Sequence, residues 1–242
     1  MIKVHHLNLK RSDKQLVSNL TMQVKAGDVV VVLGPNGAGK STLLLALSGL
    51  LTDFTGNIMF ADKPIADYTH TDLAGLVAWQ GELPPTEFGL TVQQRLQLAA
   101  SEATDKLTQA LNYFELESLT HRALGELSSG ERQRVEIAAL MMRDCPVWLM
   151  DEPTAHLDMK HQVDCLKLIK QQSKEGRLII TALHDLQQAA AVADVVVLLD
   201  GKGGVNVGKA EVLLTTAQLE PIFKVKLQGS GRNLMPSYTD EW

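Results

Sequence analysis

Short apolar runs separated by helical stretches dominate the hydrophobic pattern of the chain. Residues Asp28–Leu33 are almost all Val and Leu, which predicts a strand buried on both faces. A glycine-rich turn follows, and Ser41–Leu51 is rich in the helix formers Leu and Ala, so the two segments predict a strand–loop–helix unit. Other apolar runs predict strands at Ile2–Val4, Thr21–Val24, Gly56–Phe60, Leu76–Trp79, Val147–Met150, Leu178–Thr181 and Val195–Leu199.

Helical patterns alternate with these strands. The sequence from Thr91 to about Ala123 has helical periodicity, and Glu211–Phe223 is typical of a terminal helix. Strands that alternate with helices imply an α/β fold with a mostly parallel sheet and helices on both faces. The block from about residue 85 to 130 interrupts the alternation and predicts a separate helical lobe, whereas the polar residues 229–242 are expected to be loosely held.

Composition and charge narrow the class of protein. The 242 residues are 45% hydrophobic and 21% charged, which is typical of a globular protein. A formal net charge of −5 argues against a general nucleic-acid binder, which usually carries a basic stripe. The spacing of Cys145 and Cys165 predicts reduced, buried thiols and no metal site. We expect no secretory signal and no membrane span, because no uncharged apolar run approaches about 20 residues.

The sharpest chemical signal is a complete Walker A match, G-x-x-x-x-G-K-[ST], between a predicted buried strand and a predicted helix. Its glycines let backbone N–H groups turn inward around phosphate oxygens, and the helix N-terminus adds a positive dipole. Lys40 would reach the β- and γ-phosphates, while Ser41 would offer its hydroxyl to Mg²⁺. The predicted nucleotide-binding residues are Gly34, Pro35, Asn36, Gly37, Ala38, Gly39, Lys40, Ser41 and Thr42.

Two acids follow the apolar run Val147–Met150 where its strand should emerge from the sheet. Asp151 can hold Mg²⁺ through water, and Glu152 is placed to polarise an attacking water as a general base. An apolar run before two acids is, taken alone, more often a solvated strand end. Its pairing with Walker A favours the functional interpretation.

The segment Leu127–Glu131, followed by RQRVEIAALM, resembles the signature motif of ATP-binding subunits of the ABC transporter family. The resemblance extends over almost the whole chain. It implies a P-loop NTPase core with a mostly parallel sheet and a small antiparallel β part over residues 1–84 and 131–228. It also implies a helical signature subdomain over about 85–130, a polar tail at 229–242, and the cofactors ATP and Mg²⁺.

The resemblance implies that the signature residues Ser128, Ser129, Gly130 and Glu131 bind the γ-phosphate of ATP held by another subunit, so the active form would be a homodimer. Ser128 and Gly130 leave room for close approach of the backbone to an anion. The alternative is an ordinary helix cap with Ser at the N-cap. The family pattern usually has Gly where Ser129 stands, which would slow closure modestly, and often Gln where Glu131 stands.

The same resemblance implies functional roles for three single residues, Gln80, His184 and Asp158. Gln80 resembles the Q-loop glutamine, which touches the metal and the water. His184 resembles the switch histidine that contacts the γ-phosphate, and Asp158 resembles the D-loop aspartate at the dimer interface. The catalytic set is therefore Glu152, His184 and Gln80, and the metal set is Ser41, Gln80 and Asp151. The other histidines are interpreted as structural: His5, His6, His70, His121, His156 and His161.

One element of the family pattern is missing. ABC proteins often stack adenine on an aromatic residue between the first strands, but Leu7–Lys14 contains no Tyr, Phe or Trp. Arg11 stands about where the aromatic residue would be, and a guanidinium can stack on a base. A plain solvated basic turn is an equal alternative.

The lack of a predicted membrane span favours an importer subunit. Two further stretches resemble ATPases of siderophore, haem and cobalamin importers. These are Gly81–Val92, with the double proline Pro84–Pro85, and the ending Gly208–Val225, and the pattern is most similar to cobalamin-importer ATPases. This branch implies two membrane permease subunits, a periplasmic substrate-binding protein, a place at the cytoplasmic face of the cell inner membrane, and no nucleic acid as partner.

Two other classes compete with an importer subunit. A soluble ABC ATPase acting on nucleic acid or the ribosome usually has tandem domains or a long coiled-coil insertion, and the sequence shows neither. A P-loop GTPase would need an N-K-x-D motif, which the sequence lacks.

Overall fold

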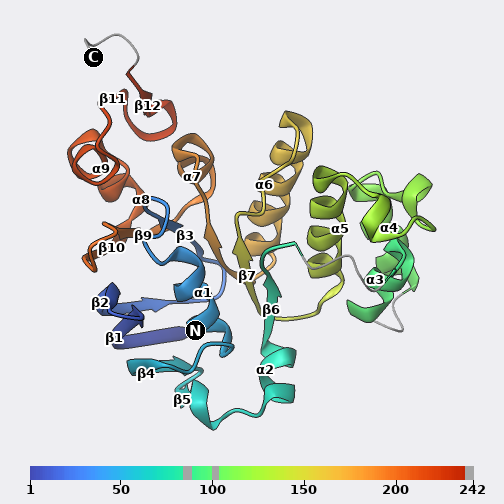
Figure 1. The fold of residues 1–242 in the computed structure, drawn as a ribbon, viewed down its shortest axis with the longest axis horizontal. Coiled ribbons are helices and arrows are strands. Elements are labelled where there is room, and N and C mark those ends of the chain that lie inside the picture. Colours follow the sequence, from blue (N-terminus) through green and yellow to red (C-terminus); the bar gives the residue numbers. More distant parts are fainter. Residues whose placement is uncertain (84–88, 100–103, 238–242) are drawn as a thin grey trace.

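A mostly parallel sheet forms the centre of the molecule. The computed structural model describes residues 1–83, 89–99 and 104–237. The order of the central sheet is β10–β9–β3–β8–β7–β6, in which β10 alone runs antiparallel to its neighbour (Figure 1). The strands are β3 (Val29–Leu33), β6 (Val77–Gln80), β7 (Val147–Asp151), β8 (Leu178–Ala182), β9 (Val195–Leu199) and β10 (Val205–Lys209).

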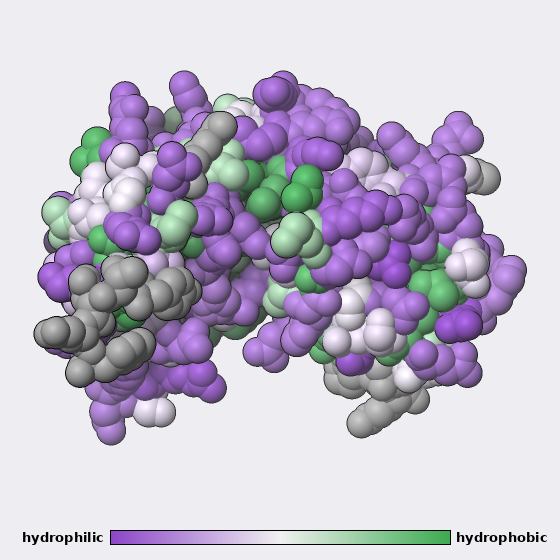
Figure 2. Space-filling view, turned by 90° about the horizontal axis from the view of Figure 1, so that it is seen from above, coloured by the Kyte–Doolittle hydropathy of each residue, from purple (hydrophilic) through white to green (hydrophobic). Residues whose placement is uncertain are grey.

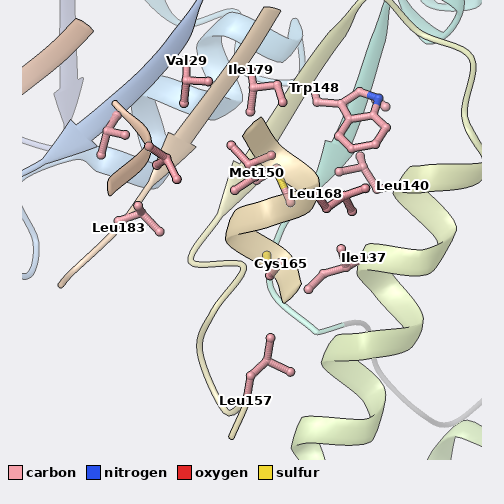
Figure 3. Packing of buried hydrophobic residues seen from close by; sticks show 14 of the residues in the cluster. Val29, Ile137, Leu140, Trp148, Met150, Leu157, Cys165, Leu168, Ile179 and Leu183 are labelled. Atoms are coloured by element: carbon pink, nitrogen blue, oxygen red, sulfur yellow. The ribbon is translucent and has the colours of Figure 1, made fainter. Parts of the chain in front are cut away.

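The central strands separate two hydrophobic cores. In β3, Val29, Val31 and Leu33 face one core, and Val30 and Val32 face the other, as the all-apolar sequence predicts. The helices that pack on the first core include α5 (Ser129–Met142), α6 (Met159–Lys174) and α7 (Leu186–Val192). Figure 3 shows the part of this core that lies against α5 and α6. The second core lies against α1 (Lys40–Ser48) and an antiparallel sheet. Both cysteines are free and buried, as predicted, and burial raises the pKa of the Cys165 thiol to about 12.

A group of helices lies beside the sheet on the side of β6. The helices α3 (Val92–Ala99) and α4 (Thr104–Tyr113) pack on α5 and, with it, stand apart from the antiparallel sheet (Figure 1). Arg95 on α3 donates from Nε and Nη2 to the Glu136 carboxylate on α5 at 2.9 and 2.5 Å. This two-pronged ion pair fixes α3 on the helix that begins with the signature residues.

The antiparallel sheet has the order β2–β1–β4–β5. Its first two strands are much longer than the predicted Ile2–Val4 and Thr21–Val24. The physical reason is a pair of irregularities at His6 (φ +52°) and Asn19 (φ +55°), which break the alternation of apolar and polar residues while the hairpin continues. The strands are β1 (Ile2–Arg11), β2 (Lys14–Val24), β4 (Phe54–Phe60) and β5 (Lys63–Pro64).

Helical predictions differ from the structure in three places. In the predicted helical stretch from Thr91 to about Ala123, residues 114–123 form turns and a short 3-10 helix at Glu117–Leu119. Helix α2 (His70–Leu76) was not predicted; it begins at a capping box in which Thr69 and Asp72 bind each other's backbone N–H. Leu76, predicted to start a strand, ends this helix. The predicted terminal helix Glu211–Phe223 is two helices, α8 (Ala210–Leu213) and α9 (Thr216–Phe223).

The C-terminal segment is held more firmly than its polar sequence predicts. Strands β11 (Leu227–Gln228) and β12 (Met235–Pro236) pair, and the Leu234 side chain is fully buried. The expectation of a loosely held segment is therefore wrong for residues 229–237, while residues 238–242 lie outside the described part. The double proline Pro84–Pro85 also lies outside it.

Within the described residues, no helix combines the length and the apolar character that a bilayer span requires. Figure 2 shows that the surface seen from above is mostly hydrophilic, with small apolar patches.

Candidate functional site

The Walker A segment, residues 34–41, forms the phosphate loop, which begins where β3 ends. Gly34 and Gly39 have φ values of +153° and +105°, which favour glycine. A β-carbon at position 34 would lie 2.6 Å from the Leu199 carbonyl oxygen, and one at position 39 would lie 2.9 Å from Cβ of Leu16. These two glycines are therefore required by the turn and by its close packing, and the turn brings Lys40 to the first residue of α1.

A pocket of about 540 Å³ opens over this loop. It brings together four segments that are separated in the sequence: the β1–β2 hairpin, the phosphate loop, the segment after β7 and the segment after β8. Of the predicted nucleotide-binding residues, Gly34, Pro35 and Ala38 do not line it, and Ala38 is buried. The lining residues are Arg11, Lys14, Leu16, Asn36, Gly37, Gly39, Lys40, Ser41, Thr42, Glu152 and His184.

Lys40 is a buried cation in the wall of this pocket. Its Nζ donates to the Gly34 carbonyl oxygen at 3.0 Å, so the side chain folds back over its own loop. Burial lowers the pKa of Lys40, while the nearby Glu152 and Asp151 act in the opposite direction. An anion in the pocket would stabilise the charged ammonium group further.

The three residues of the predicted metal set lie close together: Ser41 hydrogen-bonds the Asp151 carboxyl, and Nε2 of Gln80 lies 3.4 Å from the Asp151 carbonyl oxygen. Gln80 and Asp151 end the neighbouring parallel strands β6 and β7, and Ser41 lies in the first turn of α1. Oδ1 of Asp151 and Oε1 of Gln80 are buried and have no hydrogen-bond partner among the described residues. Burial raises the pKa of Asp151, which a hydrogen bond from Ser41 partly offsets. Unpartnered buried oxygens are costly, so this donor set fits a hard divalent cation such as Mg²⁺.

Glu152 and His184 are in direct contact. Nε2 of His184 lies 2.5 Å from Oε1 of Glu152, and both side chains are partly exposed to the pocket. Glu152 has a φ of +51°, and its backbone N–H donates to the Ala182 carbonyl oxygen at 3.1 Å. A non-glycine residue held at positive φ costs about 1–3 kcal/mol, so the surrounding structure must enforce this position.

The signature residues begin α5 and do not line the pocket of their own chain. Ser128 is the N-cap: its Oγ accepts from the Glu131 N–H at 3.2 Å and donates to the Glu131 carboxylate at 2.8 Å. Hydrogen bonds from the backbone and the hydroxyl of Ser128 lower the pKa of Glu131. Glu131, where the family often has Gln, therefore completes a capping box. Ser128 thus caps α5, whether or not it also binds the ATP of another subunit, and Ser129 is exposed beside it.

Asp158 lies away from the pocket, at the start of α6. Its carboxylate accepts from the His161 N–H at 2.9 Å and lies 2.9 Å from His161 Nδ1, and these bonds lower the pKa of Asp158. The Asp158 side chain is exposed, and His161, predicted to be structural, supports the cap. The next residue, Met159, is also exposed, which leaves an apolar group on the surface beside Asp158.

Comparisons with known proteins agree with this geometry. The model of the ABC transporter family matches residues 17–155. The chain belongs to the ABC transporter family. It is 32% identical to the hemin import ATP-binding protein of Shewanella denitrificans (94% of this chain, 95% of that protein) and 34% identical to the petrobactin import ATP-binding protein of Bacillus anthracis (95% and 90%). A putative metal-chelate type ABC transporter in an inward-facing conformation superimposes with a TM-score of 0.81 at 25% identity, covering 98% of both chains.

As an ABC transporter ATP-binding protein, the chain binds ATP and is an ATPase. The predicted fold class, with a mostly parallel sheet, a small antiparallel sheet and helices, is confirmed.

Three residues at or near the nucleotide pocket were not predicted from the sequence: Lys14, Leu16 and Gln133. Lys14 donates from Nζ to the Gly37 carbonyl oxygen at 3.0 Å, and Leu16 packs on the phosphate loop. Gln133 on α5 is buried against the segment that follows β7. The only signal for Gln133 is a polar residue at a helix position that turns out to face the core, and for Lys14 it is a basic residue near the turn of the hairpin.

Proposed function

We propose that this ABC protein is the ATPase subunit of an importer for metal-chelate compounds, such as haem or iron–siderophore complexes. The proposal is supported by the import proteins for hemin and petrobactin among its relatives and by the metal-chelate type transporter among its structural neighbours. The narrower assignment to cobalamin rests on the first hairpin without an aromatic residue and on the double proline Pro84–Pro85.

In this proposal the phosphate loop and Lys40 hold the β- and γ-phosphates of ATP. Nζ of Lys40 exchanges the Gly34 carbonyl oxygen for a phosphate oxygen. Ser41, Gln80 and Asp151 would hold Mg²⁺, because two of them carry the unpartnered buried oxygens. Bound there, Mg²⁺ would neutralise charge on the phosphates. Pro35 and Ala38 act through the shape of the loop, while Asn36 and Thr42 border the pocket.

Glu152 and His184 divide the hydrolytic work. Glu152 orients the attacking water and accepts its hydrogen bond, while His184 turns to the γ-phosphate. Their 2.5 Å contact therefore opens when nucleotide and water enter between them. The backbone of Glu152 is held at a positive φ at the wall of the pocket. We propose that this strained conformation is retained because it directs the carboxylate toward the water.

The proposed protein partners are a second copy of this chain and two permease subunits. Ser128, Ser129 and Gly130 would complete the ATP site of a second copy, with Asp158 at the interface, so the working unit is a homodimer holding two ATP molecules. Glu131 supports this surface through its bonds to Ser128. Two permease subunits, served by a periplasmic binding protein, would anchor the dimer to the cytoplasmic face of the inner membrane.

Arg11 is proposed to lie against the base of ATP, since it borders the pocket on the hairpin side. A guanidinium can stack on a planar base, although with less contact area than an aromatic ring.

Purification of the complex tests the transport function. A tagged chain isolated from membranes should bring two copies of a permease, and the complex in proteoliposomes should hydrolyse ATP faster when a binding protein loaded with haem, a ferric siderophore or cobalamin is added. Lys40→Ala in the same complex is the control for background hydrolysis. Co-purification with ribosomes or nucleic acid, and no membrane partner, would contradict the proposal.

A further inference from the structure

A buried glutamine connects the signature helix to the segment that carries Glu152. Gln133 lies one turn into α5, and only 3% of it is exposed. Its Nε2 donates to the Pro153 carbonyl oxygen at 3.0 Å and lies 3.4 Å from the Glu152 carbonyl oxygen. One amide group on α5 therefore holds two consecutive carbonyl groups, the first of them belonging to Glu152.

The same helix touches this segment at a second point. Gly130 approaches His156 so closely that a β-carbon on Gly130 would lie 2.7 Å from the His156 carbonyl oxygen. Gly130 thus has a structural reason to be glycine besides any contact with phosphate. Residues 152–156 are clasped by α5 through Gln133 near one end and through Gly130 at the other.

The rest of this segment is firmly attached on its other side. The Glu152 N–H binds the Ala182 carbonyl oxygen on β8, and Thr154 Oγ1 donates to Gln188 Oε1 on α7 at 2.7 Å. Glu152 and His156 both have positive φ, so the segment is a strained turn held in one conformation. Because the segment is attached to β8 and α7, a displacement of α5 would change the hydrogen bonds from Gln133 to the Glu152 and Pro153 carbonyl groups.

We infer that Gln133 is a positioning residue that couples the two ATP sites of the dimer. The inference rests on the proposed function, in which Ser128 and Gly130 bind the ATP of the second copy and Glu152 orients water in its own site. A shift of α5 toward that ATP would pull on Pro153 and Glu152 through Gln133. Occupancy of one site then adjusts the carboxylate in the other, and ATP hydrolysis becomes cooperative.

Replacing Gln133 by Met tests this coupling, since Met keeps the length of the side chain and removes the amide donor. The control is Gln172→Met. Gln172 is also a buried glutamine, 7% exposed, and lies away from the nucleotide pocket; its Nε2 donates to Glu175 at 2.8 Å and its Oε1 accepts from Arg177. In the full-length protein, Gln133→Met should bind ATP within about threefold of wild type, lose about tenfold in kcat, and show a Hill coefficient near 1. Gln172→Met should keep the kcat and the Hill coefficient of wild type.

A rescue variant tests whether the hydrogen-bond donor at position 133 is what the activity requires, while the Hill coefficient separates coupling from simple stability. Gln133→Glu should be least active at high pH, where a carboxylate faces the two carbonyl groups, and should recover relative to wild type as the pH falls and the protonated acid can donate. If Gln133→Met fails to fold, the recovery of Gln133→Glu at low pH still tests the inference. A Gln133→Met protein with wild-type kcat and Hill coefficient, or a Gln133→Glu protein whose relative activity does not change with pH, would overturn the inference. Loss of the proposed function itself would be seen separately, as near-wild-type hydrolysis by Glu152→Gln.

Discussion

On the phosphate side of the nucleotide pocket two charged residues are buried, with 5% of Lys40 and 8% of Asp151 exposed. On the hairpin side, Arg11 and Lys14 are exposed cations at the ends of two antiparallel strands. Charges act more strongly where solvent is excluded, because the effective dielectric constant is lower there. We therefore expect affinity and catalysis to reside on the phosphate side, and the hairpin side to contribute little and to discriminate weakly between bases.

The largest expected effect contrasts two lysines of the same pocket. Lys40→Ala should weaken ATP binding at least about 100-fold, or about 2.7 kcal/mol, because it removes a buried cation that faces the phosphates. Lys14→Ala should change ATP affinity by less than about threefold, because an exposed charge is well screened. Isothermal titration of both variants gives the two affinities. Equal losses would remove the distinction between the two sides.

Substitution of Asp151 tests, in the absence of nucleotide, how the buried carboxyl on the phosphate side affects the stability of the protein. Burial raises the pKa of this carboxyl above its unfolded value, so its stabilising contribution is present below the unfolded pKa and is lost as the pH rises through the folded pKa. At pH 7 without Mg²⁺, Asp151→Asn should therefore raise Tm by about 2–4 °C, or about 1 kcal/mol, and the gain should vanish at acid pH. The variant should also lose the extra stability that Mg²⁺ and ATP together give wild type. A lower Tm at pH 7 would show that the buried carboxylate is well paired.

The structure differs from the sequence prediction mainly where distant segments meet. The phosphate loop and the strand before Asp151 were predictable because turn glycines and apolar runs are local signals. The length of the first hairpin was not, since the irregularities at His6 and Asn19 interrupt its alternation. The burial of Leu234 and the contacts of Gln133 depend on packing between elements far apart in the chain, which periodicity does not report.

A smaller effect is expected when the base is changed. Stacking on an aromatic ring normally contributes about 1–3 kcal/mol per base, and the hairpin offers none. GTP and CTP should therefore compete for the site within about tenfold of ATP, or about 1.4 kcal/mol, in a fluorescence displacement assay. A hundredfold preference for ATP would mean that another residue recognises the base.

The smallest effect concerns Arg11 itself. If its guanidinium stacks on the base, Arg11→Ala should weaken ATP binding by a few-fold, at most about 1 kcal/mol for an exposed contact, and Arg11→Tyr should keep or improve the affinity. The same displacement assay measures both variants. Unchanged affinity in Arg11→Ala would identify Arg11 as a solvated side chain and would sharpen the contrast between the two sides.

The state of Glu152→Gln in ATP tests the account most directly. An amide in place of the carboxylate cannot take a proton from water, so hydrolysis should slow at least about 100-fold while ATP binding is kept. Light scattering after size-exclusion chromatography should then show a dimer carrying two ATP molecules, and the additional change Lys40→Ala should abolish it. Near-wild-type hydrolysis, or a protein that stays monomeric with ATP bound even together with the permease, would contradict both the role of Glu152 and the shared ATP sites.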